Sequence, residues 1–341
     1  MDIGIVFGSL TPPEHLAEGA ALAERLGFGE VWFSEDCFFT GGLSGLTQLL
    51  EATETVPAGL GLASVMTRHP AILAMELAGL ARTHPGRVRA AVGLGNSHWL
   101  RQMGLLPPRP LTAVVETFDV LRELLDGRGV DRHTGTHEFN GVRLDFPPER
   151  PPQLWIGAVN ERALRAAGAR ADGILLSVLS GPSYIAWASK TAGSGAAEAG
   201  SGNAAGFGSA GAGRTAGAAG GRGGRITAFV LASIADDGQQ ARDSVRDAVG
   251  FFLKAEAHTA LVGRSRYGAE IRQRVAALAA DEPLAVEDKW IDEFAAAGTP
   301  GEVGQRLQAL LDAGADSLGL WLFPPDRLAD QLHRASAFLT S

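Results

Sequence analysis

The feature that most constrains the fold of this chain is a repeated alternation of short apolar runs with longer segments of helical periodicity. Each apolar run has the length of one buried strand, and a turn separates it from the helical segment that follows. Strands that alternate with helices are joined by crossover connections, which makes neighbouring strands parallel. The predicted strands are residues 3–7, 31–34, 60–65, 87–94, 153–158, 172–177, 226–234 and 317–322.

Repeated strand–helix units of this number predict a closed (β/α)8 TIM barrel, as one domain over residues 1–341 with insertions. The hydrophobic fraction of 45% is enough to fill a large core. A doubly wound open sheet is the alternative that the same alternation allows. The main helices expected are residues 14–26, 43–55, 70–82, 111–125, 160–168, 182–190, 239–262, 267–280, 287–296, 300–313 and 326–339.

Two segments interrupt this pattern. Residues 130–150 are polar and broken by turn residues, which indicates an excursion with a small hairpin around residues 133–144. Residues 191–224 consist almost entirely of Gly, Ala and Ser. Because this composition buries little apolar surface, it predicts a flexible surface insertion within the domain and not a domain boundary.

Charge and composition exclude several classes of partner. The net charge of −8 argues against a nucleic-acid partner, which requires a clustered basic face. No apolar run approaches ~20 residues, so no membrane span is expected. The single cysteine, Cys37, excludes an internal disulfide, and no signal-peptide pattern opens the chain. These features suit a cytoplasmic protein that acts on a small molecule.

The carboxyl ends of the strands are where a barrel places its active site. The run over residues 60–65 is typical of such an end, because it breaks into small residues just before a helix that Pro70 begins. The other predicted strand ends are also small and apolar. They lack the facing carboxylates of a glycosidase, a histidine-rich metal site and a nucleophile elbow. The mouth therefore resembles a slot for a flat cofactor, and no metal is expected.

Few polar residues lie at these ends. Glu35 and Asp36 follow the second predicted strand, and His98 follows the glycine-rich turn after the fourth; these three are the candidates for proton transfer. The alternatives are a carboxylate that caps the next loop and a hydrogen-bonded loop histidine. For His69 a local structural role is favoured. Cys37 is interpreted as a small buried apolar residue and not as a redox group.

A further candidate site is the turn Gly157-Ala158-Val159-Asn160, which precedes a predicted helix. The free N–H groups at the start of a helix can bind phosphate, and Arg162 is near enough to help. The turn does not match GxGxxG, so it does not indicate a Rossmann nucleotide site.

Several short motifs occur along the chain in a characteristic order. Together they resemble the bacterial luciferase-like superfamily and, within it, the oxidoreductases that depend on the deazaflavin coenzyme F420. This resemblance implies a barrel, usually dimeric, that holds a deazaflavin or FMN across the strand ends. The motifs are Val31-Trp32-Phe33-Ser34-Glu35-Asp36, Ser64-Val65 before Arg68-His69-Pro70, Pro85-Gly86-Arg87 before Val92-Gly93-Leu94-Gly95, Pro152 to Gly157, Ala171-Asp172-Gly173 and Gly298-Thr299-Pro300.

The resemblance also implies roles for individual residues. Ser64-Val65 matches a pair that many family members join by a non-proline cis peptide, which forms a bulge under the isoalloxazine ring. Asp36 stands where many deazaflavin enzymes have a catalytic histidine, and Asn96 stands where the family's sugar-phosphate dehydrogenases have a glutamate; both departures argue against sugar oxidation. The cofactor-binding residues expected are Ser64, Val65, Thr67, Gly93, Leu94, Gly95, Asn96, Gly157, Ala158, Val159 and Asn160.

The sequence thus predicts an oxidoreductase that transfers a hydride between coenzyme F420 and a small organic substrate, with Asp36, Glu35 or His98 moving the accompanying proton. One alternative is an FMN-dependent monooxygenase on the same scaffold. A second is a barrel that binds the cofactor without turnover. A homodimer is expected from the resemblance. The substrate is set by the rim loops, and the fold does not specify it.

Overall fold

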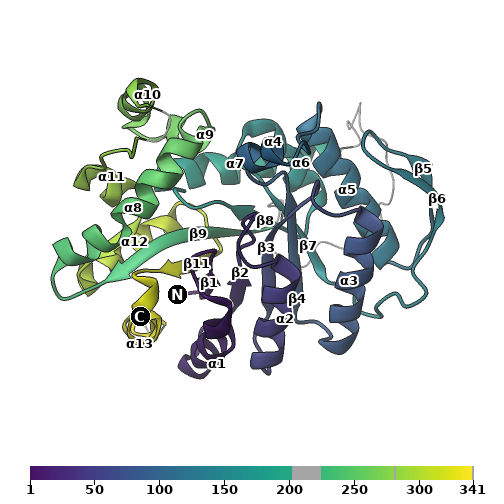
Figure 1. The fold of residues 1–341 in the computed structure, drawn as a ribbon, viewed down its shortest axis with the longest axis horizontal. Coiled ribbons are helices and arrows are strands. Elements are labelled where there is room, and N and C mark those ends of the chain that lie inside the picture. The colour runs from purple at the N-terminus through teal and green to yellow at the C-terminus, as the bar shows by residue number, and fades with distance from the viewer. Residues whose placement is uncertain (202–223, 280–281, 340–341) are drawn as a thin grey trace.

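The computed structural model describes residues 1–201, 224–279 and 282–339, and it shows a closed barrel of parallel strands surrounded by helices (Figure 1). A pairing between β8 and β9 closes the sheet, which confirms the TIM barrel and excludes the open doubly wound sheet. One further strand, β10, was not expected and pairs with the far half of β9. The strands of this sheet are β1 Ile3–Phe7, β2 Val31–Phe33, β3 Ala58–Ser64, β4 Val88–Gly93, β7 Gln153–Gly157, β8 Gly173–Leu176, β9 Arg225–Ile234, β10 Ala296–Gly298 and β11 Ser317–Leu322.

Two helix ends show capping residues that are typical in sequence. α1 ends at Gly27, which is left-handed with φ 92°, and α12 begins with a capping box formed by Thr299 and Glu302. The helices are α1 Leu16–Leu26, α2 Gly42–Ala52, α3 Pro70–Thr83, α4 Ser97–Gln102, α5 Pro110–Leu125, α6 Glu161–Arg170, α7 Pro182–Gly200, α8 Gly238–Glu256, α9 Ala260–Gly263, α10 Gly268–Ala277, α11 Asp288–Phe294, α12 Pro300–Asp312 and α13 Leu328–Ser336, with short 3-10 turns at Pro13–His15 and Pro325–Arg327. No helix among the described residues is long and apolar enough to cross a membrane.

The excursion after α5 forms the expected hairpin. Its strands, β5 Val130–His133 and β6 Glu138–Val142, are antiparallel and separate from the barrel. In Figure 1 they lie at the right-hand edge, next to α3 and α5, while α8 to α11 lie at the opposite edge. The hairpin therefore adds to the outside of the barrel and leaves the strand order unchanged.

The inside of the barrel is filled by aromatic side chains that lie against glycines on the neighbouring strand. Trp32 pairs in register with Gly59, and Trp155 pairs with Gly173. A Cβ on Gly59 would come within 2.2 Å of the Trp32 ring, and one on Gly173 within 2.3 Å of the Trp155 ring. The two indoles meet edge-on with centroids 5.3 Å apart. The interior is thus a packed core and not a channel.

The amino-terminal end of the barrel contains a buried ion pair between Glu30 and Arg89. Their side chains are 2% and 14% exposed. Ser317 donates a hydrogen bond of 3.0 Å to Glu30 Oε1, and its hydroxyl lies 2.7 Å from that of Thr227. The Arg89 guanidinium also stacks over the Trp155 ring at 5.8 Å. This network closes the end of the barrel that lies opposite the carboxyl ends of the strands. Residues at that end are expected to have a structural role.

The prediction of a flexible insertion over residues 191–224 is wrong for its first part. α7 continues through Gly200, and Ala192 and Gly195 are buried. The reason is close packing between α6 and α7, for which the small side chains are required: a Cβ on Gly168 would lie 2.1 Å from the Ala192 carbonyl oxygen, and one on Gly195 would lie 2.1 Å from the Arg165 carbonyl oxygen. Residues 202–223 of the predicted insertion lie outside the described residues.

We therefore expect Gly195→Ala to destabilise the protein by about 1–3 kcal/mol, because its methyl group would overlap backbone atoms that cannot move aside independently. Gly193→Ala is the matched control, since a Cβ there meets nothing within 4 Å. In the same helix it should be neutral or stabilising by about 0.5–1 kcal/mol. Urea denaturation of both variants measures the difference. Equal stabilities would contradict the close packing of α6 on α7.

Candidate functional site

The carboxyl ends of the barrel strands bring most of the predicted site residues to one rim. Ser9 follows β1, Asp36 follows β2 and Asn96 follows β4, while Gly157 ends β7. Because all barrel strands are parallel, these ends lie on the same side of the barrel. We refer to this side as the mouth. Among the described residues no group of three or more His, Cys, Asp or Glu side chains is placed to hold a metal ion.

The prediction of a cis peptide between Ser64 and Val65 is wrong; the non-proline cis peptide joins Gly61 and Leu62. The register of β3 against β4 shifts between Leu60 and Ala63, so the bulge lies inside the strand. Ser64-Val65 instead continues the regular ladder, because the Val65 N–H donates to the Gly93 carbonyl at 2.9 Å. A glycine within a strand often marks a bulge, but β3 contains both Gly59 and Gly61, so the sequence alone does not single out Gly61.

Val65 and Ser64 therefore have other roles than those predicted. Val65 is fully buried in the core shared by the strands and the surrounding helices, so it does not face the mouth. The Ser64 hydroxyl donates to the Leu94 carbonyl at 2.7 Å, and the Thr67 hydroxyl donates to the Ser64 carbonyl at 3.1 Å. These bonds fix the turn between β3 and α3.

Leu62 takes the place expected for Val65 as the apolar side chain of the bulge. It is half-buried and packs against the interior cluster of the barrel. Its Cδ2 atom would lie 2.8 Å from a Cβ on Gly93 and 2.3 Å from a Cβ on Gly157. The side chain thus lies across the ends of β4 and β7, and any larger residue at those two glycines would displace it. This apolar surface, formed by Leu62, Gly93 and Gly157, is called the platform below.

Glu35 is held by three hydrogen bonds. The Arg68 guanidinium donates to both carboxylate oxygens, at 2.9 and 2.6 Å, and the Gly42 N–H donates to Oε1 at 2.8 Å. The Glu35 side chain is 12% exposed. A bidentate pair with arginine holds a carboxylate in a defined orientation. The geometry therefore gives Glu35 the character of a positioning residue for the loop between β2 and α2.

Asp36, in contrast, is half-buried. Among the described residues, no cationic group donates a hydrogen bond to its carboxyl group. Burial raises the pKa of the Asp36 carboxyl, a hydrogen bond from Ser9 lowers it, and the nearby charge of Glu35 raises it further, with a net upward shift. A carboxyl group with a raised pKa at the mouth of a barrel fits a proton donor or acceptor. Burial also raises the pKa of the Cys37 thiol, which agrees with the interpretation of Cys37 as an unreactive residue.

His98 and Asn96 belong to α4, a short helix that the sequence did not predict. Asn96 is its N-cap, and its side-chain oxygen accepts a hydrogen bond of 2.8 Å from the His98 N–H. His98 itself is exposed. Trp99 stacks edge-on against Phe38 from the loop after β2, with centroids 6.5 Å apart. The contact joins two rim loops and lies beside the predicted catalytic residues.

The turn after β7 retains the features of an anion site. α6 begins at Glu161, and Asn160 occupies its N-cap position without capping it. The Asn160 side chain accepts a hydrogen bond of 3.1 Å from the Ala260 N–H instead. The first amides of α6 have no acceptor within the helix and remain available to a ligand. The carbonyl of Val159 is occupied by the Tyr184 hydroxyl at 2.8 Å.

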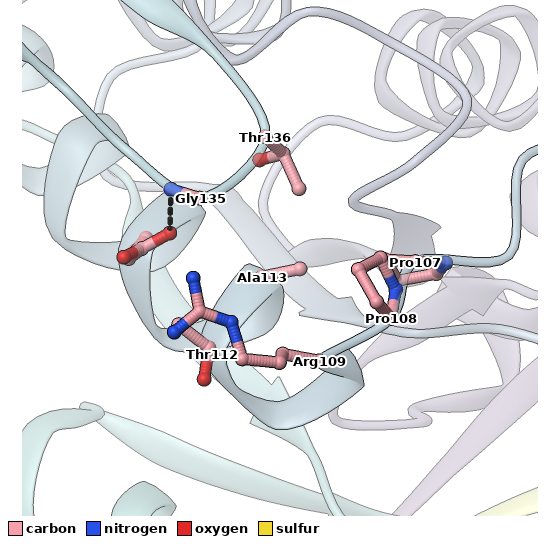
Figure 2. A pocket seen from close by; sticks show the side chains of 8 residues that line it. Pro107, Pro108, Arg109, Thr112, Ala113, Gly135 and Thr136 are labelled. Carbon is pink, nitrogen blue, oxygen red and sulfur yellow. Dashed lines mark hydrogen bonds between the residues drawn. The ribbon is translucent and has the colours of Figure 1, made fainter.

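Two other features lie away from the strand ends. The His69 ring accepts a hydrogen bond from the Ala71 N–H and packs against His137 at 4.7 Å, which supports the structural role expected for it. A hollow between the start of α5 and the hairpin turn is shown in Figure 2, where the Gly135 N–H donates to Glu116 at 2.7 Å. Its volume of about 10 Å³ suits little more than one water molecule.

Comparison with known proteins agrees with this architecture. The sequence model of the luciferase-like monooxygenase family matches residues 4–317. The chain is 27% identical over 329 residues to 5,10-methylenetetrahydromethanopterin reductase of Methanolobus tindarius, covering 93% of each chain. These findings confirm the family resemblance proposed from the sequence motifs.

Two solved structures share the fold. One is the coenzyme F420 dependent tetrahydromethanopterin reductase from Methanopyrus kandleri, with a TM-score of 0.76, 20% identity and coverage of 98% of this chain and 97% of that one. The other is a type II Baeyer–Villiger monooxygenase from Pseudomonas putida in complex with FMN, with a TM-score of 0.68, 16% identity and coverage of 98% and 96%. The fold therefore occurs in proteins of both cofactor types.

Proposed function

Because this chain belongs to the luciferase-like monooxygenase family, we propose that it is an oxidoreductase that transfers a hydride between coenzyme F420 and a small organic substrate. The observation that carries the proposal is the platform, in which Leu62 lies across Gly93 and Gly157 at the strand ends. The similarity to 5,10-methylenetetrahydromethanopterin reductase over 93% of the chain supports the choice of reaction class.

The residues present fit a flat deazaflavin. The two glycines that receive Leu62 leave no side chain of their own above the strand ends, so the platform offers an apolar surface for one face of a planar ring. The free amides at the start of α6 would hold a phosphate group of the cofactor's tail. When bound, the deazaflavin supplies a ring carbon that accepts or donates a hydride.

Asp36 is the residue of this chain that would move the proton. In the reducing direction the carboxyl group would give its proton to the substrate atom that becomes a hydroxyl or an amine. In the oxidising direction the carboxylate would take the same proton. Glu35, with Arg68 and Gly42, would position the loop that carries Asp36. His98 is exposed on α4 and is the alternative donor.

The choice between cofactors tests the proposal. We expect coenzyme F420 to bind with a Kd in the micromolar range or below and FMN to bind at least about tenfold more weakly, a difference of ~1.4 kcal/mol. Equilibrium titration followed by absorbance or fluorescence measures both. The reverse order would favour an FMN-dependent monooxygenase, for which the Baeyer–Villiger monooxygenase structure is the precedent. No binding of either cofactor would contradict both functions.

We further propose that the chain forms a homodimer through an apolar groove between α3 and the segment after β6. Ile72, Met75 and Phe146 line this groove of about 640 Å³, and they are 47%, 53% and 72% exposed. A twofold interface uses the same patch on both subunits, so a projecting side chain such as Phe146 would enter the groove of the second copy.

Met75→Glu should therefore shift the protein from dimer to monomer, because it places a charge among the apolar side chains that line the groove. Met75→Leu preserves the apolar surface and should remain dimeric. Size-exclusion chromatography with light scattering gives both masses. A wild-type monomer, or a Met75→Glu variant with unchanged dimer mass, would rule out this interface.

A further inference from the structure

The rim of the mouth presents aromatic side chains that the proposed hydride transfer does not use. Phe38 is 67% exposed on the loop after β2, and Phe39 and Leu10 are 54% and 50% exposed. Phe38 has a positive φ of 75°, a conformation that bulky residues rarely adopt. Its ring meets Trp99 edge-on at 6.5 Å. This pair, of an exposed Phe38 and a half-buried Trp99, forms one apolar wall at the mouth.

A second aromatic cluster lies at the ends of β1 and β11. The Trp321 indole lies over Gly8, where a Cβ would come within 2.0 Å of the ring. Phe252 from α8 packs edge-on against Trp321 at 5.9 Å, and Phe323 packs against Trp321 at 5.9 Å. Trp321 and Phe323 are buried, so this cluster supports the mouth from within the core. Phe251, next in the chain, remains 54% exposed. Ser9, which follows Gly8, donates to Asp36, so this cluster adjoins the proposed proton donor.

The charges near Asp36 discriminate against an anionic substrate. Arg68 uses both terminal nitrogens on Glu35, so it has little capacity left for a phosphate or carboxylate. Glu35 and Asp36 are themselves acidic neighbours at the rim. An anionic group on the substrate would add a like charge in a partly desolvated place, which is unfavourable.

We propose that the mouth selects an uncharged substrate with an apolar body that lies against the Phe38–Trp99 wall, and that it rejects phosphorylated and carboxylated substrates. This inference rests on the proposed function for the identity of the site, and it adds the chemical class of the substrate. Aromatic walls supply apolar contact area and edge-on ring contacts to such a molecule. The substrate then needs only one polar group, which would lie near Asp36.

The test compares two ketones of the same chain length, 2-octanone and 7-oxooctanoate, which differ by a terminal carboxylate. Isothermal titration calorimetry is run on the protein alone and on the protein with oxidised coenzyme F420, which cannot reduce a ketone. We expect 2-octanone to bind at least about tenfold more tightly than 7-oxooctanoate. Equal or tighter binding of 7-oxooctanoate, or no detectable binding of 2-octanone, would overturn the inference.

Variants of Phe38 and Trp99 test whether the wall binds the ketone. Phe38→Ala and Trp99→Ala should each weaken 2-octanone binding by about fivefold to tenfold, while Phe38→Tyr, which keeps the ring, should stay within twofold of the wild type. Unchanged binding in both alanine variants would contradict the role of the wall. Failure of coenzyme F420 to bind would contradict the proposed function instead, and it would leave the titration of the protein alone as a valid test of the substrate class.

Discussion

Asp36→Asn is expected to lower the rate of hydride transfer by about 10² or more, the usual scale for the loss of a general acid or base. The substitution preserves the size of the side chain and removes its proton. Coenzyme F420 affinity should change little, because the platform and the start of α6 are left intact. Single-turnover kinetics with the substrate found by the ketone comparison measures the rate.

The pH dependence gives an independent check on Asp36. Its pKa is raised, chiefly by burial, so the protonated form persists above the pH at which an ordinary aspartate ionises. If Asp36 donates the proton during reduction, the wild-type rate should fall as pH rises through this raised pKa, and Asp36→Asn should not show that step. If Asp36→Asn stays within twofold of the wild type while Glu35→Gln or His98→Ala abolishes turnover, the proton is moved by that other residue.

Glu30→Gln is expected to destabilise the protein by about 3–5 kcal/mol, the range for removing one partner of a buried ion pair. Glu30 is 2% exposed and Arg89 is 14% exposed, so the loss of the carboxylate removes the ion-pair partner of a largely buried guanidinium. Ser317 would also lose a charged acceptor. Urea denaturation measures the change in the free energy of unfolding.

The double variant Glu30→Leu with Arg89→Met is the control for this effect. It removes both charges and keeps apolar volume, so it should recover much of the stability lost in Glu30→Gln. Cofactor binding at the opposite end of the barrel should be unaffected by either change. A loss below about 1 kcal/mol in Glu30→Gln would show that the pair is solvated or mobile, against the burial that the structure gives it.

The barrel was predictable because each of its strands is a separate apolar run with a clear helical segment behind it. Residues 3–7 and 317–322 were assigned with the bounds that the structure gives to β1 and β11. Closure of the ring by β8 and β9 was an inference from the number of units. The packing of α7 was missed because composition alone cannot show that Gly195 lies against another helix, where its lack of a side chain is what permits the contact.

The site was less predictable, because it depends on contacts between distant segments. The sequence placed Glu35 and Asp36 together at a strand end, but it could not show that Arg68 binds one and that Ser9 reaches the other. It also assigned the bulge to Ser64-Val65, three residues from the cis peptide of Gly61-Leu62. A single sequence also does not display the contact of Leu62 with Gly93 and Gly157.

The central claim is that the strand ends around the platform hold a deazaflavin. The most direct test is a crystal structure of the protein at saturating coenzyme F420. We predict that the ring lies against Leu62 over Gly93 and Gly157, with the tail phosphate at the start of α6 and one ring edge open towards Asp36. Ring density outside the mouth, or a saturated crystal with no cofactor at the platform, would contradict the account.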